Sequence, residues 1–185
     1  IAADAVDIAM LSATGTASAT TFLRGDNAWA TVVSGIGTAG MWTLDSGIDL
    51  VDGENYLTGT MNNLGSVGTA MTVSSGVFTF PSTGIWKITF SGFANKTPSS
   101  PYWAVSIWKT TNDGGAWTKA AKSGNGFGDS DAYAHATAAF MFDVTDTSNY
   151  KVKFSTEEES GTGVATLFAG TPTRSYFVFE RWGDT

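Results

Sequence analysis

The sequence contains no cysteine, which excludes a disulfide framework and any metal site built on thiolates. Charged residues are scarce at 15% of the 185 residues, and acidic residues outnumber basic ones by 17 to 10. The formal net charge of −7 argues against a nucleic-acid partner, because such a partner needs a basic face that neutralises phosphates. The chain has one histidine, and no Ser-His-Asp, Cys-His, phosphate-loop or HExxH arrangement can be assembled from it. We therefore expect no catalytic residues and no enzymatic activity.

Long apolar runs are missing as well. None approaches the roughly 20 residues that a membrane-spanning helix requires, so we expect no membrane insertion. The chain starts at Ile1, and neither a basic segment nor a signal-like apolar core follows, which suggests a fragment of a longer protein. A protein that works outside the cell without disulfides needs another source of stability, and oligomerisation is the obvious one.

Glycine and aromatic residues are abundant instead, with 22 Gly, 12 Phe and 7 Trp. Strand-forming and turn-forming residues are plentiful, whereas the helix formers Glu, Lys, Gln and Arg are few. This composition predicts an all-β protein with many short strands and tight turns.

The composition changes near residue 40 and divides the chain into a stalk, residues 1–40, and a head domain, residues 41–185. The stalk is rich in Ala, Thr, Ser and Gly and buries too little apolar surface to fold as a monomer. A short amphipathic helix is predicted over Ile1–Leu11, and a β-hairpin over residues 19–33 around the turn Gly25–Asn27. We expect three copies of the stalk to pack around one axis.

Several segments of the head alternate strictly between apolar and polar residues, namely Gly84–Ser91, Ala138–Val144 and Tyr150–Phe154. Such alternation is typical of antiparallel strands with one buried and one solvated face. In the first segment, Trp86, Ile88 and Phe90 share one face, which is expected to point into the core. The head is therefore predicted to be a β-sandwich or barrel.

The last segment, Ser175–Trp182, is apolar on both faces. Phe177 and Phe179 lie on one face, and Tyr176 and Val178 lie on the other. A strand that is apolar on both faces is covered on both sides, and the second cover is expected to be a partner subunit. The candidate trimer-interface residues are Phe22, Leu23, Trp29, Tyr176, Phe177, Val178, Phe179 and Trp182.

The segment Thr72–Phe90 resembles a signature of the C1q-like, or tumour-necrosis-factor-like, jelly roll, a TGVFT-P--G-Y-F pattern across two adjacent strands. The matching residues are Gly76, Val77, Phe78, Thr79, Pro81 and Gly84. Trp86 stands where Tyr is usual, and Ser175–Trp182 resembles the aromatic-rich last strand of that family. The resemblance spans roughly Met41–Thr185, although residues 94–134 match only in strand spacing. It implies a ten-stranded jelly-roll sandwich that forms a homotrimer through its inner sheet.

The segment Ala17–Thr31 resembles the TTFLRGDGTW stretch of phage tail-fibre proteins, with Asn27 and Ala28 in place of the usual Gly and Thr. Ile1–Val6 likewise resembles repeats in the shafts of such fibres. This second resemblance implies an extracellular location in the virion, as part of a tail fibre that attaches to a host cell. Arg24-Gly25-Asp26 within the segment is the integrin-binding tripeptide, but Gly and Asp also suit a hairpin turn, which is the favoured interpretation.

Aromatic residues with polar neighbours fall in a stretch rich in Gly, Ser, Asn and Asp, where loops that carry recognition residues are expected. The candidate ligand-binding residues are Tyr102, Trp103, Asp113, Trp117, Asn125, Phe127, Asp129, Asp131 and Tyr133. Exposed aromatic rings beside such polar groups could stack against a sugar. The alternative is that these aromatic residues belong to the core or to an interface.

Acidic residues raise the question of an ion, because carboxylate oxygens suit calcium. The candidates are Asp45, Asp49, Asp52, Glu54, Asp129 and Asp131, and none of them forms the regular twelve-residue calcium loop. Calcium is thus a possible cofactor, and no other is expected. Glu157–Glu159 are expected in a solvated loop, with metal ligands or an acid/base pair as the alternative. His135 is expected to have a structural or surface role.

Together these features predict a trimeric phage tail-fibre tip that binds a glycan or a protein on the host cell surface. The first alternative is a C1q-like structural or adhesion module of another virion component or of a bacterial surface protein. The second, ranked below it, is an enzyme that depolymerises surface polysaccharide, which would need two carboxylates facing each other across a sugar.

Overall fold

The computed structural model describes residues 12–19, 21–31, 36–97, 102–127, 132–159, 164–169 and 172–185. The chain separates into two compact units, Ile1–Gly35 and Ile36–Thr185, called here the N-terminal unit and the head. The first strand of the head, β3, starts at Thr38, slightly before the boundary expected from composition. The helix predicted over Ile1–Leu11 lies outside the described residues. In the described ranges no helix is long and apolar enough to span a bilayer.

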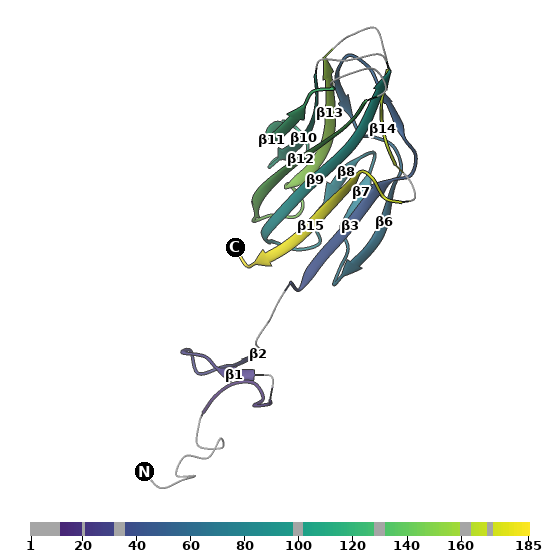
Figure 1. Ribbon diagram of the computed structural model, residues 1–185. Helices are drawn as coiled ribbons and strands as arrows, with labels where there is room; N and C mark the ends of the chain where they lie inside the picture. The colour runs from purple at the N-terminus through teal and green to yellow at the C-terminus, as the bar shows by residue number, and fades with distance from the viewer. Residues whose placement is uncertain are drawn as a thin grey trace. The chain divides into compact units, whose positions relative to one another are not determined.

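The N-terminal unit contains an antiparallel hairpin of β1 (Thr21–Leu23) and β2 (Trp29–Thr31) (Figure 1). Asn27 adopts a positive φ of 60° in the turn, and the Arg24 backbone N–H donates a hydrogen bond to the Ala28 carbonyl at 2.8 Å. Arg24 and Asp26 form an ion pair with each other at 3.1 Å. The Arg-Gly-Asp tripeptide is therefore part of a hairpin turn.

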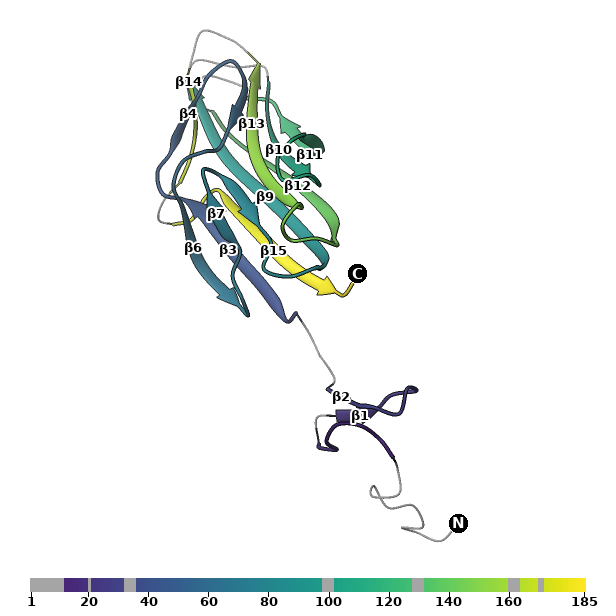
Figure 2. The same cartoon turned by 180° about the vertical axis from the view of Figure 1, so that it is seen from behind.

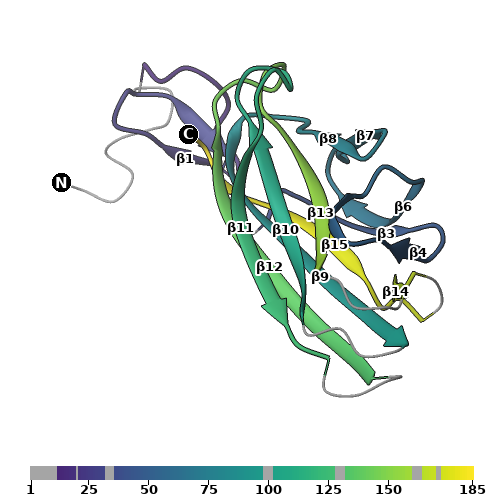
Figure 3. The same ribbon diagram turned by 90° about the horizontal axis from the view of Figure 1, so that it is seen from above.

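One sheet of the head has six strands. They are β5 (Gly53–Tyr56), β7 (Thr72–Ser74), β8 (Val77–Thr79), β10 (Tyr102–Thr110), β11 (Thr118–Asn125) and β13 (Lys151–Glu159). Their order is β11-β10-β13-β8-β7, and β5 pairs with the end of β13 that β8 leaves open. The strands β11 and β7 lie at opposite edges of this sheet (Figure 3).

The other sheet has seven strands. They are β3 (Thr38–Leu44), β4 (Ile48–Leu50), β6 (Met61–Val67), β9 (Gly84–Thr97), β12 (Ala132–Val144), β14 (Val164–Leu167) and β15 (Tyr176–Gly183). The long strand β9 pairs with β12 on one side and with β15 and β14 on the other, and β15 continues the sheet to β3 and β6 (Figures 1 and 2).

Every strand pair within the two sheets is antiparallel, so the predicted all-β sandwich is confirmed. The expected total of ten strands is too low, because the structure adds the short strands β4, β5 and β14. These three lie beside the longer strands near the ends of the sheets, where the sequence carries turn residues and no strong alternation.

The core lies between the two sheets and is built on the alternation seen in the sequence. Trp86, Ile88 and Phe90 of β9 are fully buried, as predicted. The ring of Phe154 on β13 lies 4.5 Å from that of Phe177 on β15, centroid to centroid. Aromatic contacts between strands of opposite sheets therefore join the two layers.

The hairpin between β7 and β8 explains the glycine at the start of the jelly-roll signature. Its two turn residues, Ser75 and Gly76, have φ values of 48° and 76°, as a two-residue hairpin turn requires. A Cβ atom on Gly76 would overlap the carbonyl oxygen of Leu57. Glycine is therefore needed here both for the backbone conformation and for the close approach of another segment.

Candidate functional site

Two of the aromatic residues predicted to bind a ligand belong to the core. Trp103 is fully buried and Phe127 is 5% exposed, and their rings stack 6.1 Å apart. The prediction of ligand contacts was wrong for both, and the core alternative holds, because Trp103 alternates inward with Val105 on β10. The candidates Asp129 and Asp131 lie outside the described residues.

Trp117 lies in a cluster on the outward face of the six-stranded sheet, the face that points away from the core. The Nζ atom of Lys153 is 4.0 Å from the ring centroid of Tyr56, 4.5 Å from that of Trp117 and 5.9 Å from that of Trp108. Burial lowers the pKa of Lys153, against the raising effect of the nearby charge of Glu54. We call Tyr56, Trp108, Trp117 and Lys153 the Lys153 cluster, a cation held by aromatic ring faces.

A network of ion pairs borders the Lys153 cluster. Lys119 Nζ lies 2.7 Å from Glu54 Oε2 and 3.2 Å from Glu157 Oε2, and Lys122 Nζ lies 2.7 Å from Glu157 Oε2. Burial alone would lower the pKa of Lys119, but its hydrogen bonds to Glu54 and Glu157 outweigh that effect and raise it. The hydrogen bond from Lys122 is the main reason that the pKa of Glu157 is lowered.

This network does not favour polysaccharide cleavage. A general acid for glycoside hydrolysis needs a raised pKa, whereas the pKa of Glu157 is lowered. The expectation that Glu157–Glu159 form a solvated loop was wrong, because all three lie within β13. Glu157 faces outward to the lysines, and Glu158 is 2% exposed on the core side.

Tyr102, Asp113 and Asn125 lie at the surface. Tyr102 is half-buried, with Lys122 Nζ 5.2 Å from its ring centroid. Asp113 is in the turn between β10 and β11, has a positive φ of 54° and pairs with Lys151. The side-chain amide of Asn125 donates a hydrogen bond to the His135 carbonyl at 3.2 Å. Each of these polar groups thus has a partner within the head, and they do not converge on one site.

Tyr133 belongs to a second aromatic cluster, on the outward face of the seven-stranded sheet. Its ring stacks on Phe93 of β9, with 5.5 Å between centroids and 16° between planes. Phe168, after β14, lies 5.9 Å from Phe93 and 6.1 Å from Tyr133. The Arg174 guanidinium carbon is 5.0 Å from the Phe168 ring centroid and 5.9 Å from that of Phe93. We call Phe93, Tyr133, Phe168 and Arg174 the Arg174 cluster.

His135 is exposed on β12, next to this cluster and opposite Phe93 in the strand register. Its Nε2 atom and the Ser91 hydroxyl are hydrogen-bonded at 2.7 Å, and the Thr137 hydroxyl donates to Ser91 at 3.3 Å. Neither neighbour is a carboxylate that would activate the imidazole for catalysis.

The acidic residues proposed for calcium point to different partners. Asp45 accepts a hydrogen bond from the Asn62 amide at 2.7 Å, Asp49 accepts one from Thr166 at 2.8 Å, and Glu54 pairs with Lys119. Across the described part of the chain, no group of three or more His, Asp or Glu side chains is placed to hold a metal ion. The described candidates therefore do not fit a calcium site.

The predicted interface residues on the last strand divide between two environments. Phe177 and Phe179 are fully buried in the core of the head, so their assignment to a subunit interface was wrong. Tyr176 and Val178 are half-buried on the outward face, and Trp182 is 60% exposed there. In the N-terminal unit, Phe22 is 47% and Leu23 is 38% exposed, and Trp29 is half-buried.

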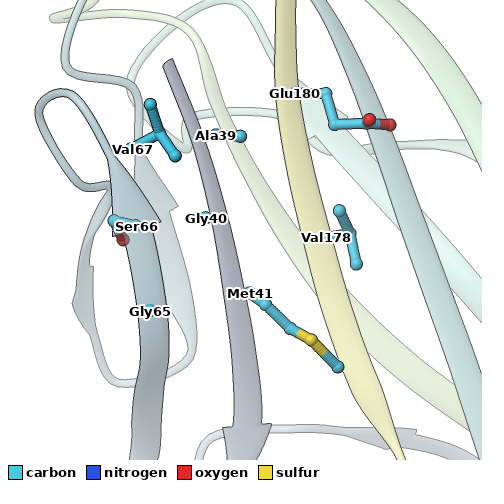
Figure 4. A pocket seen from close by; sticks show the side chains of 8 residues that line it. All are labelled: Ala39, Gly40, Met41, Gly65, Ser66, Val67, Val178 and Glu180. Carbon is cyan, nitrogen blue, oxygen red and sulfur yellow. The ribbon is translucent and has the colours of Figure 1, made fainter. Parts of the chain in front are cut away.

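The outward face of the seven-stranded sheet carries a row of further apolar side chains. Its exposed members include Val67 on β6, Ile85 on β9 and Met141 on β12. Between β6, β3 and β15 the face has a shallow apolar hollow of about 290 Å³, whose lining is drawn in Figure 4. Met41 and Val178, which pair across β3 and β15, lie side by side in it.

No family model and no curated protein matches the sequence. Solved structures match it in fold. Murine APRIL, in its crystal structure at pH 5.0, matches with a TM-score of 0.59 over 78% of this chain and 98% of its own, at 10% identity. The head has the TNF/C1q-like jelly-roll fold. Eiger TNF from S. frugiperda gives the same TM-score over 80% of this chain and 93% of its own, at 9% identity.

The jelly roll brings together surface residues that sequence reasoning missed. Phe93, Phe168 and Arg174 join Tyr133, although they lie on separate segments of the chain. Extending the alternation of β9 past Ser91 would have placed Phe93 outward, and an aromatic residue on a solvated face is a usable signal. The contributions of Phe168 and Arg174 carry no such signal, because they depend on where β14 and β15 pair along β9.

Proposed function

We propose that this chain is the trimeric tip of a phage tail fibre and attaches the virion to its host through the jelly-roll head. The resemblance of Ala17–Thr31 to tail-fibre sequences supports the fibre and, with it, a location outside the cell in the virion. The resemblance of Thr72–Phe90 to C1q-like heads supports the trimer.

The observation that carries the proposal is the apolar outward face of the seven-stranded sheet. Val67, Ile85, Met141 and Trp182 are all exposed on it, and Val178 lies beside them. Several exposed apolar side chains on one face of a sheet, with the Lys87–Glu180 ion pair among them, are typical of an interaction surface. The strand register puts Val67, Ile85, Met141 and Trp182 at one end of this face. Covering that end with further copies of the chain leaves the opposite end of the face and the outward face of the six-stranded sheet to contact a receptor.

The experiment measures adsorption of the phage that encodes this chain, with and without an excess of the purified protein. Native protein is expected to slow adsorption by occupying receptors on the host cell. Heat-unfolded protein at the same concentration is the control and is expected to have no effect. If saturating native protein leaves adsorption unchanged, host attachment is refuted, and a structural module of another virion component or of a bacterial surface protein becomes the better interpretation.

A further inference from the structure

The Arg174 cluster exposes aromatic surface on a rigid support. Tyr133 is 62% exposed, although its ring is fixed against Phe93 on the neighbouring strand. Phe93 and Phe168 are also tied together through the backbone, because the Phe168 N–H donates to the Phe93 carbonyl at 2.9 Å. The Phe93 N–H donates to the Ser175 hydroxyl at 3.0 Å, which anchors the residue next to Arg174. The rings are thus held in place before any ligand arrives.

Arg174, Lys109 and Lys153 are the basic side chains described on the head that rest on aromatic rings without an ion pair, and Arg174 is the exposed one of the three. Lys87, Lys119, Lys122, Lys151 and Arg181 each pair with a carboxylate. Arg174 is exposed and rests on two phenylalanine rings, and within the described residues it makes neither an ion pair nor a hydrogen bond. All N–H donors of its guanidinium therefore remain available for an external acceptor. A carboxylate fits best, because its two oxygens can accept two parallel N–H groups of the planar guanidinium.

We propose that the Arg174 cluster binds an acidic saccharide, with the sugar carboxylate on Arg174 and a sugar ring against the exposed ring of Tyr133. This site would be the part of the head that recognises the host, and so it rests on the attachment function proposed above. A uronic acid and a sialic acid are the two candidate sugars, because both carry a carboxylate that the Arg174 guanidinium can bind.

A saccharide suits this site because the exposed Tyr133 ring is held nearly parallel to the Phe93 ring, with Phe168 tilted beside them. A sugar ring has an apolar face that can lie on an aromatic ring while its hydroxyls remain in water, as the exposed Tyr133 ring allows. The polar groups beside the Lys153 cluster are less suited, because they already bond to each other: Ser155 accepts from Trp108 Nε1 at 2.7 Å and donates to Glu54.

The position of the cluster within the head also fits a recognition site. Phe93 lies near the end of β9, and Tyr133 near the start of β12. Thr38, where β3 begins, and Gly183, where β15 ends, lie at the opposite end of the same sheet (Figures 1 and 2). The cluster thus lies away from the end at which the chain enters the head.

The test measures binding of the full chain, by calorimetry, to trigalacturonic acid and to sialyllactose, with galactotriose and lactose as the matched neutral sugars. We expect an acidic sugar to bind and its neutral counterpart to bind at least about tenfold more weakly, the effect of losing a charge-assisted pair. Arg174→Gln is expected to weaken acidic-sugar binding to a similar degree. Tyr133→Ala is expected to weaken it about three- to tenfold, whereas Tyr133→Phe, which keeps the ring, is expected to retain it.

Arg24→Gln is the matched control, since it removes the same charge from the N-terminal unit. The proposal is overturned if neither acidic sugar binds, if neutral sugars bind equally well, or if the Arg174 and Tyr133 variants bind like the parent chain. The mass of every variant is also measured by light scattering, to test whether the Arg174 cluster is a subunit contact. A Tyr133→Ala variant that loses the oligomer but still binds sugar would show that it is. If the Arg174→Gln variant blocks phage adsorption as strongly as the parent chain does, this site is refuted and the attachment function stands.

Discussion

Lys119 connects three strands of the six-stranded sheet through a single ammonium group. It lies on β11 and bonds to Glu54 on β5 and to Glu157 on β13, and Lys122 adds a second bond to Glu157. These side chains are between about a quarter and a third exposed, so solvent weakens each pair. The network still makes stability depend on pH, because the pKa values of Lys119 and Lys122 are raised and that of Glu157 is lowered.

Replacing Glu157 with Gln is expected to destabilise the head by less than about 1 kcal/mol at about pH 7. The folded-state pKa of Glu157 is lowered from its usual 4.5, so its contribution is present above that value and is lost as the pH falls through the folded pKa. The difference in unfolding free energy between parent and variant should therefore close in acid. Urea unfolding across a pH series, at one protein concentration, measures it.

Lys122→Gln tests the same contact from the other side. The pKa of Lys122 is raised, so its contribution is present below the usual 10.5 and is lost as the pH rises through the folded pKa. In acid, Lys122→Gln should also converge on the parent, because its carboxylate partner is then protonated. The double variant should cost less than the two single changes added together. A Glu157→Gln deficit that stays constant into acid would show that the pair does not form.

At the scale of the element, the two faces of β15 lie in different environments, one in the core and one at the surface. It lies between β9 and β3, so both of its edges are paired. Phe177 and Phe179 fill the core, whereas Val178 and Trp182 look outward from the same strand. Substitutions on the two faces should therefore affect two separate properties of the protein.

Phe179→Ala is expected to destabilise the fold of the head by about 3–5 kcal/mol, because it removes a fully buried ring and leaves a cavity. Trp182→Ala removes a ring that is 60% exposed, so we expect the protomer to keep its fold and lose affinity for its neighbours. Chemical denaturation measures the first effect, and the mass from light scattering on dilution measures the second. Equal unfolding midpoints for the two variants would contradict this division.

Alternation in the sequence predicted the strands whose inner and outer residues differ clearly. Trp86, Ile88 and Phe90 were placed correctly in the core for this reason. Trp103 was not, because the Pro- and Ser-rich residues before it look like a loop and hide the start of β10. Among short segments without a regular period, local sequence does not show which side chains the opposite sheet will cover.

The surface clusters show a second limit of sequence reasoning. Lys153 meets Tyr56 and Trp117, which come from strand and turn segments far from it in the sequence. Arg174 meets Phe93 in the same way. Such contacts follow from strand order and register, and no spacing within one segment specifies them. The residue types could be predicted as recognition residues, but not their grouping.

At the scale of the whole molecule, the two units have unequal means of stabilising themselves. The buried apolar cluster of the head, from Trp42 to Phe179, lies entirely within residues 36–185. The described part of the N-terminal unit offers one two-stranded hairpin, with Phe22 and Leu23 exposed. An isolated hairpin of this kind is marginally stable in water. The head should therefore fold by itself, and the N-terminal unit should depend on association.

A chain lacking residues 1–35 tests which unit carries the oligomer. Because the apolar outward face of the seven-stranded sheet belongs to the head, we expect the shortened chain to keep its β-sheet circular dichroism spectrum and to remain trimeric. For the full chain, the mass from light scattering should be three times 19.4 kDa. Adding Trp182→Ala to the shortened chain should then yield folded monomers, since the N-terminal unit no longer holds the copies together. A shortened chain that is folded but monomeric would instead assign the association to residues 1–35, and a monomeric full chain would refute the trimer.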